Sequence, residues 1–378
     1  MTSTPTSPRS TPRRVLILGA QGRFGRAATQ AFVDAGWQVL AQVRRAPAQP
    51  WPTAPDGRAV VQTVIEPLTS VPALAAACGG PVDVLVWAVN PPYTAWDQTL
   101  LPLAELGMDL AERLGARFVL PGNVYNHGPR PAAQLLESTP VPGPAEPNTP
   151  KGRLRIELEQ RLQARAPRLR SLVLRAGDFF GSGRGNWFDE ALVKNLPAGR
   201  LVYPGPDDRE HAWAYLPDLT RALVTLCERL EDQPDALPSP AAVVHGPSFN
   251  LTGRALLDAL EAAARRTGLA PATPGRPMRR SRLPWTLMRL AGLFVPMLRA
   301  LAEMRYLWWQ PHALHSAHLG RLLPDWQPTP LADALDASLR ELFPAQTRAA
   351  GTAAPAKVGT TATAATPTGL PRAQPSAH

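Results

Sequence analysis

The stretch Val15-Leu16-Ile17-Leu18-Gly19-Ala20-Gln21-Gly22-Arg23-Phe24-Gly25 decides the fold of this chain. Its four leading apolar residues predict a buried parallel strand. The glycines at 19, 22 and 25 predict a sharp turn into a helix, because glycine lets the backbone turn tightly and approach a pyrophosphate. A helix N-terminus supplies free N–H groups and a positive dipole end for phosphates. The pattern predicts a dinucleotide site containing Gly19, Gln21, Gly22, Arg23, Phe24 and Gly25.

The residues after this turn favour a nucleotide site over a purely structural glycine turn. An amphipathic helix is predicted over Arg23–Ala35, and a second strand over Gln38–Val43. NAD-binding units place an acid after that strand to accept hydrogen bonds from the ribose hydroxyls. This chain has Arg44 and Arg45 there, whose charge and fork geometry suit a 2′-phosphate. A solvated loop is the alternative. We predict NADP as the cofactor, with NAD as the second choice.

The first half of the chain alternates strands with helices, and this order predicts a doubly wound parallel sheet of the Rossmann type. Strands are predicted at 15–18, 38–43, 60–64, 84–88, 117–120 and 171–174, with helices at 23–35, 71–78, 100–114 and 154–166. The second half is less regular and rich in proline. Helices near 187–195, 217–230, 252–267, 284–309 and 330–343 predict a smaller, mostly helical lobe. Such a lobe covers the carboxyl edge of the sheet, where open α/β sheets bind ligands.

These patterns divide the chain into four parts. Residues 14–175 form the predicted NAD(P)-binding domain, and residues 176–345 form a substrate lobe that is interleaved with the sheet. Residues 1–13 and 346–378 are rich in Pro, Ala and Thr without hydrophobic periodicity, so we expect both to be disordered tails.

Composition excludes several classes of function. The formal net charge is +10, but Arg9, Arg13, Arg14, Arg348, Lys357 and Arg372 lie at or beyond the ends of the folded body. No basic and aromatic stripe is present, so no nucleic-acid partner is expected. Cys78 and Cys227 are far apart in helical contexts and predict neither a disulfide nor a metal site. No apolar run is long enough to span a bilayer, and no secretory leader is recognisable, so the prediction is a cytoplasmic protein without an integral membrane segment.

Four further motifs, in the correct order, resemble those of the extended short-chain dehydrogenase/reductases, the NAD-dependent epimerase/dehydratase family. They are Ala88-Val89-Asn90-Pro91-Pro92-Tyr93 after the fourth strand, Asn123-Val124-Tyr125 after the fifth, Leu174-Arg175-Ala176-Gly177-Asp178-Phe179-Phe180-Gly181, and Ala212-Trp213-Ala214-Tyr215-Leu216-Pro217-Asp218-Leu219. Together with the glycine turn, they extend the resemblance over about residues 14–345.

The resemblance implies positions for cofactor and substrate. Gly19, Gly22 and Gly25 would hold the pyrophosphate, and Arg44 the adenosine phosphate. Ala88 and Asn90 would line the cofactor cleft, and Glu66 falls near the acid that contacts adenine in the family. Asn123, Asp178 and Trp187 are the predicted substrate residues. Asp178 could instead cap its turn, and Trp187 could belong to the core.

The catalytic residues of the family are replaced here. Redox members use a Tyr-x-x-x-Lys pair and a Ser or Thr on the fifth strand. Aligning Thr149-Pro150-Lys151-Gly152-Arg153-Leu154-Arg155 with that pattern puts Lys151 at the tyrosine position and Arg155 at the lysine position, while Pro121 stands at the serine position. Arg155 can hold a ribose hydroxyl but does not titrate near neutral pH. Tyr125 is the leading substitute proton donor, and Lys151 with a lowered pKa is the rival.

Three interpretations follow. The first is an NAD(P)-dependent oxidoreductase or epimerase that acts on a small-molecule carbonyl or hydroxyl, including a sugar-nucleotide, through non-standard acid/base groups. The second is a catalytically silent NADP(H) sensor similar to the NmrA-like regulators, which the missing Tyr/Lys pair favours. The third is a peripheral membrane module built on Pro284–Leu301 beside the basic run from Arg276 to Arg282, although the periodicity predicts a core-facing side there. A homodimer remains open.

Overall fold

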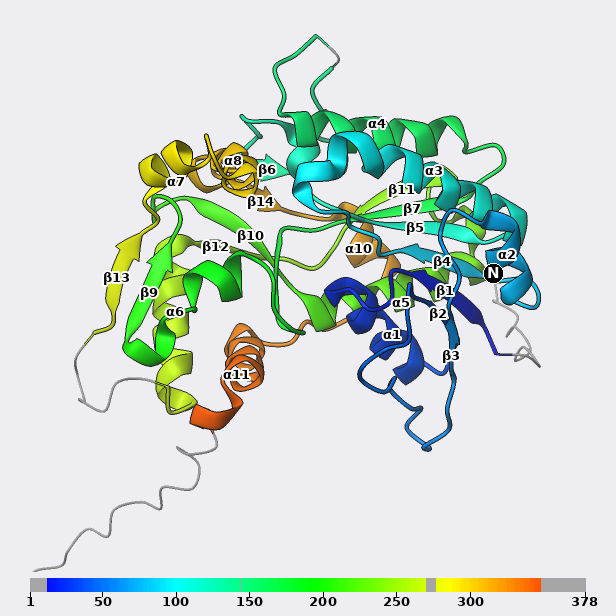
Figure 1. The fold of residues 1–378 in the computed structure, drawn as a ribbon, viewed down its shortest axis with the longest axis horizontal. Coiled ribbons are helices and arrows are strands. Elements are labelled where there is room, and N and C mark those ends of the chain that lie inside the picture. The colour runs from blue at the N-terminus through cyan, green and yellow to red at the C-terminus, as the bar shows by residue number, and fades with distance from the viewer. Residues whose placement is uncertain (1–11, 144, 270–276, 348–378) are drawn as a thin grey trace, which may run out of the picture.

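The computed structural model describes residues 12–143, 145–269 and 277–347. Its centre is a seven-stranded sheet in the order β11-β7-β5-β4-β1-β2-β3, with every neighbouring pair parallel (Figure 1). The strands are β1 (Arg14–Leu18), β2 (Gln38–Gln42), β3 (Val61–Val64), β4 (Val84–Trp87), β5 (Arg117–Gly122), β7 (Ser171–Arg175) and β11 (Ala241–His245). The predicted Rossmann-type sheet is confirmed.

The strand order reverses between β1 and β4. The chain runs outward from β1 through β2 to β3, then returns to β4 and continues to the opposite edge. The loops that follow β1 and β4 therefore lie side by side at the carboxyl edge, and the Ala88 N–H donates to the Leu18 carbonyl at 3.0 Å. Such a reversal is where doubly wound sheets bind their ligands.

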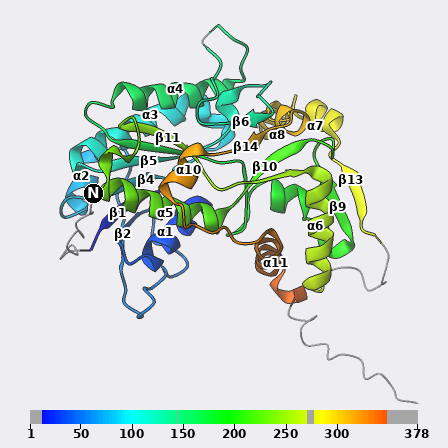
Figure 2. The same ribbon diagram turned by 180° about the vertical axis from the view of Figure 1, so that it is seen from behind.

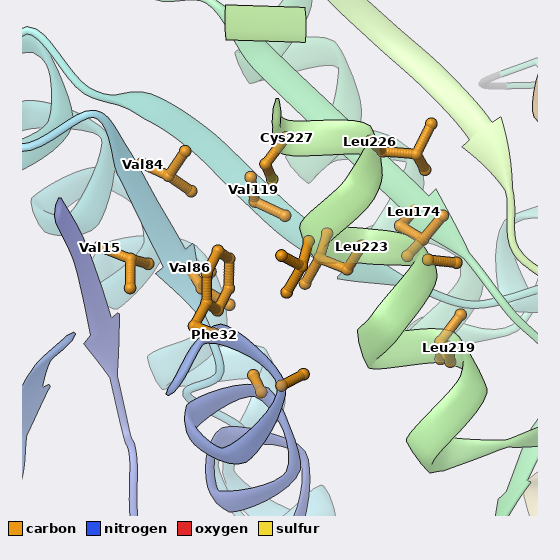
Figure 3. Packing of buried hydrophobic residues seen from close by; sticks show 14 of the residues in the cluster. Val15, Phe32, Val84, Val86, Val119, Leu174, Leu219, Leu223, Leu226 and Cys227 are labelled. Carbon is orange, nitrogen blue, oxygen red and sulfur yellow. The ribbon is translucent and has the colours of Figure 1, made fainter. Parts of the chain in front are cut away.

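Helices cover both faces of this sheet (Figures 1 and 2). One face carries α1 (Arg23–Asp34) and α5 (Leu216–Asp232), and the other carries α2 (Val71–Ala77), α3 (Trp96–Leu114) and α4 (Pro150–Ala164). Figure 3 shows Phe32 of α1 and Leu223 of α5 packing over valines of the sheet, such as Val86. Burying each such side chain contributes roughly 1.5–3 kcal/mol, so this layer holds the glycine turn in place.

The six predicted strands of the first half are all present, but the sequence analysis did not predict the seventh. β11 is short and contains only Val243 and Val244 as strongly apolar residues, between two proline-containing segments. It comes from beyond residue 175, as does α5, so the second half of the chain completes the central sheet and its helical cover.

The second lobe contains small sheets as well as helices. Its largest sheet joins β8 (Asp178–Phe180), β10 (Glu210–Tyr215) and β12 (Phe249–Thr252), and two-stranded pairs join β9 (Arg200–Tyr203) to β13 (Arg279–Arg282) and β6 (Gln134–Leu135) to β14 (Ala313–Leu314). The helices that follow β12 are α6 (Gly253–Arg266), α7 (Trp285–Ala291), α8 (Pro296–Glu303), α9 (Tyr306–Trp309), α10 (Ala317–Leu322) and α11 (Leu331–Leu342). Of these, α10 packs on the core of the central sheet through Leu322.

Two predicted helices were wrong. The segment 284–309 forms α7, α8 and α9 rather than one helix, because Pro296 holds Val295 in an extended conformation with ψ of 102°. The segment 187–195 forms only a π turn at Phe188–Leu192.

One residue of the predicted N-terminal tail contacts the folded body. Arg13, which falls in the predicted N-terminal tail, accepts a hydrogen bond at its carbonyl from the Gln38 N–H at 2.9 Å and forms an ion pair with Asp232. Residues 1–11, 348–378 and Arg276 lie outside the described residues. Within the described ranges, no helix is long and apolar enough to cross a membrane.

Candidate functional site

The glycine turn after β1 has the shape of a phosphate cradle. Gly19 has a φ of 74°, a conformation that side chains disfavour. A Cβ at Gly25 would collide with the Gly19 carbonyl oxygen and lie 2.8 Å from the Ala20 Cα, so α1 starts directly against the turn. Gly22 is the N-cap of α1 and offers no side-chain cap. The first amides of α1 are therefore free to receive an anion, which is the fit expected for the pyrophosphate of NAD(P).

A buried glutamine that the sequence analysis missed fixes this turn. The Gln42 Oε1 at the end of β2 accepts from the Gly19 N–H at 3.1 Å, and its Nε2 donates to the Glu66 carbonyl at 2.8 Å. Gln42 thus joins the ends of β1, β2 and β3, and brings Glu66 beside the turn through its main chain. The available signal was a polar residue that ends an apolar strand.

Arg44 and Arg45 follow directly and are exposed. Gln21 reaches them through its Nε2, which donates to the Arg45 carbonyl at 3.1 Å. Among the described residues, neither guanidinium has an ion-pair or hydrogen-bond partner, so both are available to an anionic ligand at this end of the turn.

Arg23 and Phe24, at the start of α1, face the second lobe. The Arg23 guanidinium donates to the carbonyls of Gly181 and Ser182 and pairs with the buried Asp189 at 3.0 Å. Phe24 packs against Phe179. These contacts tie the loop after β8 to the glycine turn. On the other side of the turn, Ala88 is half-buried and Asn90 exposed.

Two tyrosines meet where the loops after β4 and β5 come together. The hydroxyl oxygens of Tyr93 and Tyr125 are 2.8 Å apart, and the Asn123 Oδ1 accepts from the Tyr125 N–H at 3.1 Å. Tyr125 is buried, with 7% of its surface exposed, whereas Tyr93 is half-buried. Tyr125 is the predicted proton donor, whereas Tyr93 was not among the predicted site residues.

Burial changes the acidity of both tyrosines in the same direction. Burial raises the pKa of Tyr125 well above its ordinary value, and its neighbours Tyr93 and Asp178 raise it further. Burial also raises the pKa of Tyr93, but the hydrogen bond with Tyr125 and the charge of Arg155 oppose that rise. Both hydroxyls are therefore protonated at neutral pH.

Arg155 brings its positive charge to this pair from α4. The helix begins here because Thr149 caps it, accepting from the Gly152 N–H at 3.1 Å, and because Pro150 suits the first helical position. The Arg155 guanidinium lies 4.8 Å from the centre of the Trp96 ring, and its Nε is buried without a hydrogen-bond partner in the described part of the chain. An unsatisfied buried donor is costly, so this atom is suited to a ligand oxygen.

Lys151, at the family's tyrosine position, is committed elsewhere. It is buried, and its Nζ forms an ion pair with Glu303 of α8 and donates to the Ala300 carbonyl at 3.3 Å. The Lys151 N–H donates to the same Glu303 carboxylate at 3.1 Å. The ammonium also lies 5.3 Å from the centre of the Tyr93 ring. Lys151 therefore links α8 to the start of α4, next to the Tyr93 ring.

We expect Lys151→Met to lower stability, because it leaves the half-buried Glu303 without its cation. Breaking a buried pair by removing one partner costs about 3–5 kcal/mol, and the exposure of Glu303 (21%) reduces this to about 1–3 kcal/mol. Glu303→Gln should lower the melting temperature similarly, and Glu190→Gln, at an exposed ion pair with Lys194, should not. Equal melting temperatures for wild type and both variants would contradict the assignment.

Asp178 and Trp187 also meet residues of the second lobe. The Asp178 carboxylate is 2.8 Å from the Nε2 of His211, a buried histidine that stacks on Trp308. Trp187 packs edge-on against Trp308 and tilted against Trp285, so it lies at the border of the lobe's core. The contact of the Asp178 carboxylate with His211 thus joins β8 to β10 and does not cap the turn after β8.

The comparisons with known proteins agree with this architecture. Residues 15–237 match the NAD dependent epimerase/dehydratase family. A dTDP-6-deoxy-L-talose 4-dehydrogenase (NAD(P)(+)) of Kitasatospora kifunensis is 26% identical over 206 residues, which are 52% of this chain but only 62% of that protein.

Two solved structures have a similar fold. L-threonine dehydrogenase of Clostridium difficile aligns with a TM-score of 0.64 at 15% identity, covering 88% of this chain and 98% of that one. UDP-glucuronic acid 4-epimerase of Bacillus cereus, solved in complex with NAD, aligns with a TM-score of 0.63 at 14% identity, covering 87% of this chain and 96% of that one. The comparisons do not support the NmrA-like alternative. Because the family match covers more than half of its residues, the chain belongs to the NAD-dependent epimerase/dehydratase family.

Proposed function

We propose that this protein is an NAD(P)-dependent oxidoreductase that reduces a carbonyl group, with the Tyr93–Tyr125 pair as its proton source. The observation that carries the proposal is the 2.8 Å contact between the two hydroxyls, beside the charge of Arg155 and at the sheet edge where the glycine turn lies. Family membership supports the cofactor class. Two raised tyrosine pKa values favour donating a proton over abstracting one at neutral pH.

The roles of the residues follow from their contacts. A reduced nicotinamide, when bound, supplies the hydride that reduces the carbonyl carbon. Tyr93, the more exposed of the two residues, transfers its proton to the carbonyl oxygen. The Tyr125 hydroxyl donates a hydrogen bond to the developing Tyr93 phenolate, and Arg155 stabilises the same negative charge. Asp178 and Asn123 remain the proposed substrate residues, and Lys151 serves to position α8.

The substrate class that we propose is a nucleotide-linked sugar. The curated relative is named as a dehydrogenase of a dTDP-linked sugar, and one structural neighbour is named as an epimerase of a UDP-linked one. A nucleotide-linked 4-keto sugar contains the carbonyl to be reduced. It also contains a nucleoside diphosphate, which the second lobe would bind.

The test is consumption of NADPH and NADH, followed by absorbance, over a panel of nucleotide-linked keto sugars, free keto sugars and small ketones. We expect turnover with at least one nucleotide-linked keto sugar. Turnover only with small ketones would overturn the substrate class. Tight cofactor binding without turnover on any member of the panel would favour the sensor interpretation instead.

We expect NADP(H) to bind more tightly than NAD(H), because the free guanidinia of Arg44 and Arg45 stand where an acid would serve NAD. Arg44→Asp should weaken NADP binding roughly 10- to 100-fold, the value of a lost charge-assisted hydrogen bond, and should leave or improve NAD binding. Isothermal titration calorimetry with both cofactors measures this.

The matched control is Arg113→Asp, an equal charge change at an exposed residue that precedes β5 and so lies at the opposite edge of the sheet. It should leave both affinities unchanged. Equal wild-type affinities for the two cofactors would refute the NADP preference.

A further inference from the structure

The turn between α7 and α8 exposes an unusual concentration of apolar side chains. Phe294 is 87% exposed and Leu293 is 72% exposed. With their neighbours they form what we call the apolar tip: Leu287, Leu290, Leu293, Phe294, Val295 and Met297. Only two other large apolar side chains in the described residues are exposed, Ile65 and Leu136, so the tip is a single concentrated patch. Exposed apolar patches of this kind mark interaction sites.

α7 and α8 are joined to the rest of the protein through residues outside the tip. On α7, Trp285 is buried and its Nε1 donates to the Pro204 carbonyl at 2.5 Å. On α8, Glu303 and the Ala300 carbonyl hold Lys151. Figure 1 shows the pair at the outer margin of the second lobe. The periodicity of this segment predicts a core-facing side, and the structure adds exposed apolar side chains.

Arginines precede, follow and interrupt the tip in the sequence, and acids are absent from this stretch. Arg282, Arg289 and Arg299 are exposed, and the pairing of β13 with β9 sets Arg279 beside Arg200, which are also exposed. We call these five the basic rim. Among the described residues, none of the five has an ion-pair partner, whereas Arg280 beside them pairs with Asp258. No Asp or Glu occurs between residues 276 and 302.

The apolar tip and the basic rim together indicate which kind of surface could cover the tip. In a symmetric contact with a second copy, each tip would meet the same patch, so the two basic rims would repel each other. An anionic lipid surface instead offers negative headgroups to the rim and hydrocarbon to the tip. A projecting turn with Leu and Phe at its apex inserts into such a surface, and arginines at its base bind the headgroups.

We propose that this protein docks on anionic membrane surfaces through the apolar tip and the basic rim, without spanning the bilayer. The proposal stands independently of the proposed reaction. Because α8 also contacts Lys151 under the tyrosine pair, docking would hold the candidate site close to the lipid surface.

The experiment is co-sedimentation of the full chain with vesicles of phosphatidylcholine alone and with about one third phosphatidylglycerol. We expect binding only to the anionic vesicles, weakened by salt. Arg282→Gln with Arg289→Gln should weaken it on the order of 30-fold, since each basic residue near such a surface contributes about a factor of five. Leu293→Ser with Phe294→Ser should weaken it about tenfold or more.

Matched variants separate the tip from general charge and hydrophobicity. Arg113→Gln with Arg229→Gln removes the same charge from exposed arginines at other helix ends, and Leu136→Ser removes an exposed leucine elsewhere. Both should bind like wild type. Equal effects of tip and control variants, or no binding to anionic vesicles, would overturn the proposal. So would a dimer, measured by light scattering, that the Leu293→Ser, Phe294→Ser variant dissociates while vesicle binding is absent.

Discussion

Tyr93→Phe is expected to lower kcat for carbonyl reduction by about 10²-fold or more, the usual contribution of one positioned acid, while cofactor affinity stays the same. The substitution removes the hydroxyl that we propose as the proton donor and keeps the ring that lies beside Lys151 and Trp96. Tyr125→Phe should lower kcat as well, by a smaller factor, because it removes only the hydrogen bond that supports the Tyr93 phenolate. Steady-state rates with the substrate found in the panel, together with cofactor titrations, measure both.

Tyr203→Phe is the matched control. Tyr203 is also a buried tyrosine, whose pKa burial raises, but it packs against Trp308 in the core of the second lobe. Its loss of a hydroxyl should leave kcat nearly unchanged. A large loss in Lys151→Met, with both tyrosine variants fully active, would transfer the acid/base role to the lysine and reject the tyrosine pair.

Gly22→Val is expected to abolish measurable cofactor binding in a protein that still folds. The backbone of Gly22 has a φ of −66°, which any residue can adopt, and a Cβ there would lie 3.3 Å from the Gly19 carbonyl oxygen. The valine therefore fits with a small adjustment of the turn, but its methyl groups occupy the approach of the pyrophosphate. Calorimetric titration with NADP, after a thermal melt has shown that the variant is folded, measures the effect.

Valine substitutions at two other glycines serve as comparisons for Gly22→Val. Gly25→Val should unfold or strongly destabilise the chain, because its side chain would overlap the backbone of residues 19 and 20. Gly320→Val, at a helical glycine with nothing within 4 Å of an added Cβ, should bind NADP like wild type. Wild-type affinity in folded Gly22→Val protein would remove the glycine turn as the cofactor site.

The sequence predicted well where the signal is local. The glycine turn, α1 and the apolar strands of the first half repeat a period or a motif within a dozen residues, and each lies where it was expected within a few residues. α4 was expected from Leu154, but it begins at Pro150 because Thr149 caps it. Buried parallel strands and capped helices can therefore be predicted from short stretches of sequence.

The parts that were missed depend on contacts between distant residues. Tyr93 and Tyr125 are 32 positions apart, and Lys151 and Glu303 are 152 apart, so no local pattern reveals either pair. The role of Gln42 could not be predicted because its two hydrogen-bond partners lie at the ends of other strands, Gly19 after β1 and Glu66 after β3. His127, two residues after Tyr125, is buried near Arg175, and burial lowers its pKa to about 3. Tertiary packing decides such cases.

The position of β11 has a consequence for how the chain emerges from the ribosome. β7 ends at Arg175 and is buried along its whole length, and β11 is the strand that pairs with its outer edge in the described part of the chain. At the usual ~5–20 residues per second, the nascent domain holds that apolar edge unpaired for some seconds. An open, flat strand edge invites pairing with other chains. This interval is therefore when a chaperone would have most to protect, and when slowed translation between α5 and β11 would most increase aggregation.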